Sequence, residues 1–305
     1  MGKYLSPLNS YSFKRIFGTE KNKDILIHFL NDILGFTGLA AIHDVEFLAT
    51  ILDPEIAAKK QSIVDVLCKD FQGSRYIIEM QFTKTKGFEK RAQYYAAKAY
   101  SSQADQGDEY HNLKEIIFIA VADCIIFPDK IEYKSNHTIR DEHTNEHDLK
   151  DFYFVFIELP KFTKTKEDQL ENIVEKWCYF FRYAAETNEE DLDKIVGSDV
   201  IIKRAYEEMN KFNWSEEELL AYEQRKKRIM DEIAAFAEKF DEGLRLGQEK
   251  GRLEGIQIGH EKGKIEGKIE VAKNLLQAGI SIDIVSQTTG LSSSEIKQLQ
   301  SEKTR

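Results

Sequence analysis

The sequence predicts an α/β protein followed by an all-helical extension. Several runs rich in β-branched and aromatic residues are apolar on both faces, as strands inside an α/β domain are. Segments with apolar residues at helical spacing alternate with these runs. Towards the C-terminal end the strand-like runs stop and glycines recur at every fourth position. We therefore expect a main domain over 1–240, a glycine-containing helical segment over 241–270 and a small helical bundle over 271–305.

The first part of the chain predicts two helices and a strand. A short helix at Phe13–Phe17 should end at Gly18, and an amphipathic helix over 21–34 should pack its apolar face on the sheet. A strand follows over 45–51. The acids of the next turn, Asp53-Pro54-Glu55, are either outer neighbours of a metal site or ordinary loop residues.

The stretch from Ser62 to Phe82 predicts a β-hairpin. Gln72-Gly73-Ser74 is a turn signal between two runs of strand-forming residues. If the pairing is centred on Gln72, Asp65 lies directly opposite Glu79, with β-carbons about 5 Å apart. Because side chains alternate along a strand, the residues divide between two faces. One face carries Ile63, Asp65, Leu67, Ile77, Glu79 and Gln81, and the other carries Val64, Val66, Cys68, Tyr76, Ile78 and Met80.

Two carboxylates at one point of an apolar hairpin indicate a metal site. Such a pair costs several kcal/mol unless a cation neutralises it. A hard divalent ion such as Mg²⁺ suits two carboxylates and takes its remaining ligands from water and phosphate. The pattern therefore predicts a metal-dependent phosphodiester site. The alternative is that the hairpin bends and both acids point into solvent at a sheet edge.

The helix expected after the hairpin, Gly87–Ala104, carries candidate substrate-binding residues. Arg91, Tyr95 and Lys98 lie along one face of this helix. Arg91 is a candidate to hold a phosphate and Tyr95 to orient the substrate, although tyrosines at this spacing are also common in cores. A basic cluster, Lys84, Lys86, Lys90 and Arg91, is either a phosphate-binding patch or a solvated face.

Two further strands and a covering helix complete the predicted domain. The strands are expected over 115–122 and 152–159, and the helix over 166–185. The stretch 129–150 is polar and contains His137, His143 and His147. No spacing in it matches a helical histidine pair, so we favour a surface insertion over a metal site.

The C-terminal part predicts self-association and a helix-turn-helix. Glycines at positions 243, 247, 251, 255, 259, 263 and 267 would let two helices approach closely, and the alternative is a flexible spacer. Over 271–299, Gly279 should end one helix, Ser281 should cap the next, and Ser292 with Glu295 should form a capping box. The third helix offers Ser294, Lys297 and Gln298 to DNA. A helical bundle used for dimer contacts explains the same pattern.

Composition restricts the class of protein. The 305 residues carry a formal net charge of −10, which argues mildly against nucleic acid but says little about local patches. No apolar run is long enough to span a bilayer, and the first residues lack the apolar core of a signal peptide, so we expect a cytoplasmic protein. The three cysteines, Cys68, Cys124 and Cys178, are scattered and are expected to be buried as small hydrophobes.

Several motifs together carry a family resemblance. They are Phe13-Lys14-Arg15-Ile16-Phe17-Gly18-Thr19-Glu20, Asp65, Ile78-Glu79-Met80-Gln81, Arg91 with Tyr95 and Tyr100, Gly107-Asp108-Glu109-Tyr110, and the run from Phe154 to Phe162. In this order they resemble the recombination-promoting nuclease (Rpn) and putative transposase branch of the PD-(D/E)XK nuclease superfamily. The resemblance covers nearly the whole chain and implies a central mixed sheet flanked by helices.

The resemblance implies a Mg²⁺-dependent DNA endonuclease, with Mn²⁺ as a possible substitute. Asp65, Glu79 and the main-chain carbonyl of Met80 would bind the ion. Glu20 is either an accessory acid or, as we favour, an ordinary first-turn glutamate that the helix dipole stabilises. The chain departs from the superfamily at Gln81, where most members have a lysine, and carries Ser10 where relatives often have an acid. Gln81 is a candidate catalytic residue with Asp65 and Glu79, because its amide can hydrogen-bond water and phosphate. It cannot carry charge, so either the rate is modest or Lys98 or Arg91 compensates. The alternative function is a catalytically silent nuclease fold that acts as an oligomeric DNA-binding or regulatory module.

Overall fold

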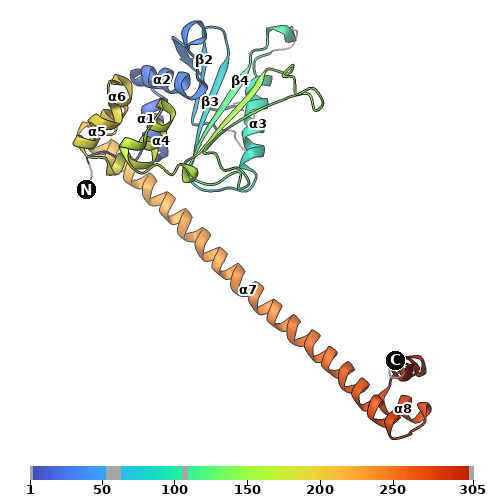
Figure 1. The fold of residues 1–305 in the computed structure, drawn as a ribbon. Coiled ribbons are helices and arrows are strands. Elements are labelled where there is room, and N and C mark those ends of the chain that lie inside the picture. Colours follow the sequence, from blue (N-terminus) through green and yellow to red (C-terminus); the bar gives the residue numbers. More distant parts are fainter. Residues whose placement is uncertain (1–2, 53–62, 105–108, 302–305) are drawn as a thin grey trace. The chain divides into compact units, whose positions relative to one another are not determined.

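A mixed sheet of six strands is the centre of the fold in the computed structural model, which describes residues 3–52, 63–104 and 109–301 (Figure 1). The strand order is β1-β2-β3-β4-β6-β5. Strand β3 pairs in parallel with β4, and β4 pairs in parallel with β6, whereas the other neighbours are antiparallel. The strands are β1 Val45–Phe47, β2 Val66–Asp70, β3 Arg75–Gln81, β4 Ile116–Ala122, β5 Lys134–Thr138 and β6 Phe152–Glu158. The predicted α/β class is confirmed.

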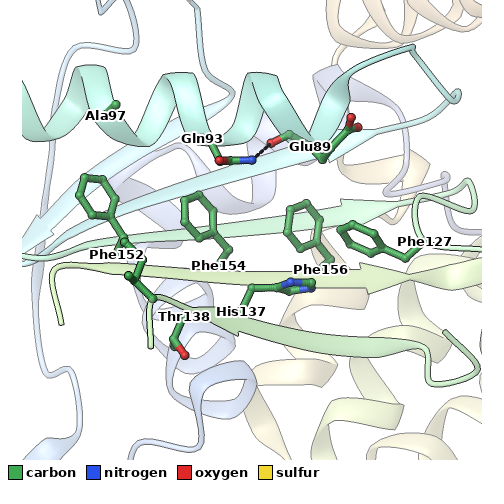
Figure 2. Close-up of a pocket in the computed structure, with 10 residues that line it drawn as sticks. Glu89, Gln93, Ala97, Phe127, His137, Thr138, Phe152, Phe154 and Phe156 are labelled. Atoms are coloured by element: carbon green, nitrogen blue, oxygen red, sulfur yellow. Dashed lines mark hydrogen bonds between the residues drawn. The ribbon is translucent and has the colours of Figure 1, made fainter. Parts of the chain in front are cut away.

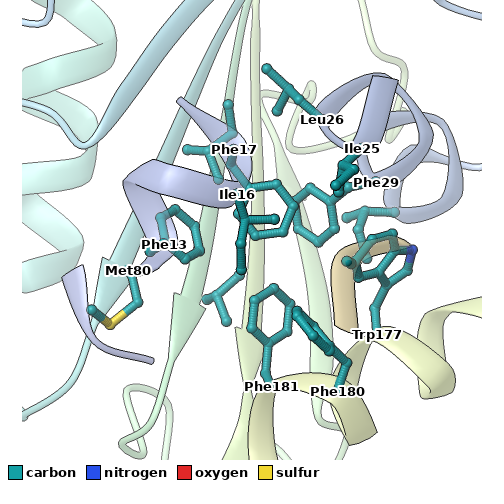
Figure 3. Close-up of a cluster of buried hydrophobic side chains, with 14 of the residues drawn as sticks. Phe13, Ile16, Phe17, Ile25, Leu26, Phe29, Met80, Trp177, Phe180 and Phe181 are labelled. Atoms are coloured by element: carbon teal, nitrogen blue, oxygen red, sulfur yellow. The ribbon is translucent and has the colours of Figure 1, made fainter. Parts of the chain in front are cut away.

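Helices cover both faces of this sheet. They are α1 Ser10–Phe17, α2 Lys23–Leu34, α3 Phe88–Ser101, α4 Ile173–Tyr183, α5 Glu189–Val196 and α6 Val200–Glu208. The larger core joins one face of the sheet to α1, α2, α4, α5 and α6, and Figure 3 shows its aromatic centre around Phe17, Phe29 and Trp177. The smaller core lies under α3, whose buried alanines allow the helix to pack closely on β4.

The chain divides into two compact units, Met1–Met230 and Asp231–Arg305. The long helix α7, Glu216–Gln277, begins in the first unit and ends in the second. The glycines at positions 243 to 267 all lie within α7, and apart from the adjoining backbone of this helix no atom of the described residues lies within 4 Å of where their β-carbons would be. No helix in the described part of the chain is both long and apolar enough to cross a membrane.

The second unit ends in the predicted helix-turn-helix. Helices α8 Ile282–Thr289 and α9 Ser293–Ser301 pack with the end of α7 around the buried side chains of Ala272, Val285, Leu291 and Ile296. The capping box is confirmed, because the Ser292 N–H donates to Glu295 Oε2 at 2.7 Å and the Glu295 N–H donates to Ser292 Oγ at 3.3 Å. Ser281 occupies the N-cap of α8, but its side chain makes no capping hydrogen bond.

Some predicted elements differ in the structure. Strand β1 ends at Phe47. The pairing continues irregularly, through hydrogen bonds from the Leu48 N–H to the Leu67 carbonyl and from the Val64 N–H to the Thr50 carbonyl and through a bridge between Ile51 and Ile63. Helix α4 begins at Ile173 rather than near residue 166, after a short 3₁₀ turn over Glu167–Gln169. The stretch interpreted as a surface insertion contains β5, a polar edge strand whose regular backbone hydrogen bonds come from β6.

The face predicted for Val64 is wrong. Its side chain lies with Leu67 and Ile77 in the core under α3, not with Val66 on the other face. The backbone bends at Asp65, just before β2 begins, so the strict alternation of side chains is broken there. Of the cysteines, Cys68 and Cys178 are buried as expected and Cys124 is half-buried.

Candidate active site

The hairpin of β2 and β3 has the register that the sequence predicts. Val66 pairs with Ile78, and Leu67 pairs with Ile77, which places Asp65 opposite Glu79. The turn depends on Gly73, which has a φ of +89° that a residue with a β-carbon rarely adopts. The prediction that the two acids meet at one point of the hairpin therefore depends on local turn geometry, and it is confirmed.

The two acids are joined through each other's backbone. The Asp65 N–H donates to Glu79 Oε1 at 3.1 Å, and the Met80 N–H donates to Asp65 Oδ2 at 3.0 Å. The carbonyl of Gln81 accepts from the Asp123 N–H on the β4 side of the strand at 2.8 Å. Because main-chain groups of successive strand residues point to opposite sides, the carbonyl of Met80 points towards β2, the side on which Asp65 lies.

Glu79 is a buried carboxyl group, and the positive charges near it do not offset the effect of burial and of Asp65 on its pKa. The residue is only 6% exposed. Burial, followed by the negative charge of Asp65, raises the pKa of Glu79 to about 8, although Arg91 and Lys14 act in the opposite direction. A cation bound beside this carboxyl group would stabilise its ionised form.

Lys14 pairs with Asp65, and the sequence predicts no role for it. Its Nζ lies 3.6 Å from Asp65 Oδ1. The buried face of α1 carries Phe13, Ile16 and Phe17, and the side chain of Lys14 is half exposed at the edge of this face. Its place in the Phe-Lys motif was visible, but nothing local indicated that α1 would lie beside the hairpin.

Gln81 holds Arg91. Its Oε1 accepts from the Arg91 guanidinium, and its Nε2 donates to the carbonyl of Thr83 and to Thr85 Oγ1, the latter at 3.3 Å. The Arg91 guanidinium also lies over the Phe88 ring, 4.8 Å from its centroid. Its Nε is buried without a hydrogen-bond partner among the described residues. The amide therefore fixes the guanidinium next to Glu79, whose pKa the positive charge lowers.

Tyr95 lies on the same flank of α3, one turn after Arg91. Burial raises the pKa of Tyr95, Arg91 opposes this, and the charges of Glu79 and Asp65 raise it further. The phenol is therefore an uncharged hydrogen-bond donor near the two acids. The Nζ of Lys98 lies over the ring of Tyr94, 4.8 Å from its centroid.

The remaining candidate acids do not join the pair. The Glu20 carboxylate pairs with Lys23 at 2.9 Å. In the described part of the chain no three His, Cys, Asp or Glu residues form a group that could hold a metal ion, the histidines of 129–150 included. Asp53 and Glu55 lie outside the described residues. Of the candidate acids that the structure describes, Asp65 and Glu79 are thus the two that lie together.

Comparisons with known families match both parts of the chain. The family described as PD-(D/E)XK nuclease family transposase matches residues 7–239, which include every strand of the sheet and the two acids. The Rpn/YhgA-like nuclease family, C-terminal HTH domain, matches residues 266–301, which include α8 and α9. No curated protein and no solved structure matches the chain.

Proposed function

The chain belongs to the PD-(D/E)XK nuclease family of transposases, and we propose that it is a divalent-metal-dependent DNA endonuclease. The resemblance to the Rpn nuclease branch is confirmed by the match of its C-terminal domain. Family membership suggests a nuclease, and the helix-turn-helix suggests DNA binding. DNA breakage in transposition or recombination, or in defence against foreign DNA, is the setting that we propose.

The observation that carries this proposal is the buried pair Asp65 and Glu79. Two carboxylates that share one point, one of them with its pKa raised to about 8, leave a deficit of positive charge. Mg²⁺ is commonly bound in proteins by one or two carboxylates, with waters and substrate phosphate as the other ligands. The donor set of Asp65, Glu79 and the Met80 carbonyl therefore fits Mg²⁺, with Mn²⁺ as a substitute.

The chain's own residues supply positioning and charge around this ion. When bound, the ion would activate water and stabilise negative charge at the phosphate. Arg91, fixed by Gln81, is the proposed phosphate ligand on one side, and the Tyr95 hydroxyl is a donor that orients the substrate. On the other side the Lys14 ammonium, 3.6 Å from Asp65 Oδ1, adds a positive charge beside the pair.

Gln81 stands where most of the superfamily has lysine, and its amide is engaged by Arg91, Thr83 and Thr85. We propose that Lys14 and Arg91 together supply the positive charge that the lysine would bring. We propose Lys98, further along α3, as an additional substrate contact. Glu20, which pairs with Lys23, would be an accessory acid only if substrate binding moved it towards the pair.

Plasmid cleavage tests the proposed function. The purified protein should nick or cut supercoiled DNA with Mg²⁺ and not with EDTA, and Asp65→Ala and Glu79→Ala should each abolish cleavage. Fluorescence of the buried Trp177 and Trp214 reports whether the variants keep the fold. Cleavage by either folded variant at the parent rate would refute the assignment.

A catalytically silent module is the second candidate, and the engagement of the Gln81 amide favours it. Isothermal titration with Mn²⁺ separates the two functions. An active nuclease should bind the ion through Glu79 and lose binding in Glu79→Gln, whereas a silent module would show no metal binding that depends on this residue.

Self-association through the glycine row of α7 is the proposed partner contact besides DNA. Apart from the adjoining backbone of α7, no described atom lies within 4 Å of where these β-carbons would be, so a β-carbon can be added at each glycine without a clash in the described part of the chain. Gly251→Leu and Gly255→Leu should therefore leave the protein folded and lower its mass in light scattering, because they block the close approach of two helices. Gly251→Ala is the small control, which gains helix propensity. A monomeric parent, or an unchanged oligomer in the leucine variants, would contradict this proposal.

A further inference from the structure

Helix α3 has a second flank that faces away from the two acids. Arg91 and Tyr95 lie on the flank beside the acids, and the alanines at positions 92, 96 and 99 lie on the sheet. On the opposite flank Glu89, Gln93 and Ala97, each four residues apart, form one wall of a groove with a volume of about 480 Å³. The other wall comes from β6 and β5 (Figure 2).

Aromatic rings form the floor of this groove. Figure 2 shows Phe152, Phe154 and Phe156 in a row along β6, with their rings directed towards α3. The rings of Phe152 and Phe154 are nearly parallel, at 8°, with centroids 6.5 Å apart. Phe127 stands edge-on to Phe156 with centroids 5.0 Å apart. Phe127, Phe152 and Phe154 are only partly buried, so their rings are accessible from the groove.

The groove continues into a basic hollow at its Phe127 end. This hollow, of about 400 Å³, shares Glu89 and Phe127 with the groove and is also lined by Lys84 and Lys86. Both lysines are exposed, and the Nζ of Lys130 lies 5.7 Å from the centroid of the Phe127 ring. Lys84 and Lys86 are in the loop that leaves β3 shortly after Glu79 and Gln81. The basic end of the groove is therefore next to the candidate active site along the chain.

We propose that this groove binds single-stranded DNA, with unpaired bases stacked on Phe152 and Phe154 of β6 and the adjoining phosphates held by Lys84 and Lys86. The inference rests on the proposed function for the identity of the polymer. It adds a site for a strand that has left the duplex, on the flank of α3 opposite the acids.

The chemistry of the groove favours this occupant. Every base has a planar face that stacks on an aromatic ring without regard to sequence, and basic side chains follow the backbone of a single strand. Residues two apart on a strand repeat at about 6.6 Å, so the accessible rings of Phe152 and Phe154 form two regularly spaced stacking surfaces. Bases inside a duplex already stack on each other and cannot use such a row. A purely apolar ligand has no negative group that could pair with Lys84 and Lys86.

Two further residues of the groove, His137 and Glu89, should affect how tightly it binds a single strand. Burial lowers the pKa of His137, with Lys130 acting in the same direction, so the imidazole beside Phe127 and Phe156 is uncharged at neutral pH and serves as a further flat surface. The Glu89 carboxylate stands at the junction of groove and hollow, where it repels a phosphate. Removing its charge should therefore strengthen binding.

Fluorescence anisotropy in EDTA tests the proposal without cleavage. The probes are a labelled oligothymidylate of about 15 nucleotides and a duplex of the same length. Phe154→Leu keeps an apolar side chain but removes the aromatic face, and should weaken single-strand binding by about tenfold with little effect on the duplex. Glu89→Gln should strengthen it. The matched control is Phe212→Leu, which changes an exposed phenylalanine outside the groove.

A tryptophan probe gives a second readout that does not depend on loss of binding. Trp177 and Trp214 are buried and therefore out of reach of an added oligonucleotide. A change in tryptophan fluorescence of the Phe152→Trp variant would then report on the groove. Oligothymidylate should quench it, because bases stack on the indole. No quenching, or equal affinity of the parent and Phe154→Leu for the single strand, would overturn the proposal. These outcomes are independent of plasmid cleavage. A protein that cuts DNA but fails both binding tests would refute the proposed groove and leave the proposed nuclease activity standing. A protein that binds the single strand but never cuts DNA would refute the nuclease activity and leave the groove standing.

Discussion

Replacing Glu79 by glutamine should make the metal-free protein more stable at high pH. The pKa of Glu79 is raised from 4.5 to about 8, mainly by burial. The folded state therefore holds a proton between these values that the unfolded state has released, and this stabilisation, complete below pH 4.5, is lost as the pH rises towards 8. Each pH unit in this window is worth about 1.4 kcal/mol, so the loss is on the order of 4 kcal/mol. Glutamine carries no charge and keeps an oxygen that accepts the Asp65 N–H.

Urea unfolding at two pH values measures this effect. Trp177 and Trp214 are buried in the first unit and report on its unfolding. In EDTA the parent and Glu79→Gln should be of similar stability near pH 5, and the variant should be more stable by roughly 3 to 4 kcal/mol near pH 8. Added Mg²⁺ should stabilise the parent and not the variant. Glu46→Gln, which changes an exposed carboxylate, is the control.

A stability difference that does not change with pH would refute this reasoning. So would a Glu79→Gln protein that is less stable than the parent near pH 8. Either result would mean that the carboxylate already has a compensating charge in the metal-free protein, and the argument for a cation site would fail with it.

The remaining predictions concern neighbours of the pair and the C-terminal unit. Lys14→Met should raise the pKa of Glu79 further and shift the pH–rate profile of cleavage upwards, and an unshifted profile would remove Lys14 from the site. Gln81→Ala should destabilise the fold by about 1–3 kcal/mol, because the Arg91 guanidinium loses its hydrogen-bond acceptor. A double-mutant cycle with Arg91→Ala, measured by urea unfolding, should show that the two side chains are energetically coupled. Ser292→Ala should cost about 1 kcal/mol and speed amide hydrogen exchange in α9 about fivefold, whereas unchanged exchange would show that the capping box contributes nothing.

Local chemistry predicted the parts of the site that are close in the sequence. The turn at Gly73 and the two-residue period of the strands set the pairing, and this pairing alone brings Asp65 opposite Glu79. The capping box at Ser292 was equally predictable, because it joins groups three residues apart. The roles of the site residues stay predictions until cleavage and metal binding are measured.

Edge strand β5 was missed because its residues have no apolar period. Lys134–Thr138 is polar and only partly buried, and its pairing partner is β6, after an intervening loop. The face of the sheet to which Val64 points was also predicted wrongly. A bend at Asp65 interrupts the alternation of side chains, and no residue type at this position indicates the bend.

By itself the sequence determined the α/β class, the hairpin register and the helix-turn-helix, because turn conformation, side-chain alternation and capping act over a few residues. Only the tertiary structure decided that Lys14 contacts Asp65, that Gln81 is engaged by Arg91 and that the phenylalanines of β6 face a groove. These contacts join elements whose relative positions depend on the packing of helices on both faces of the sheet, and no local pattern records that packing.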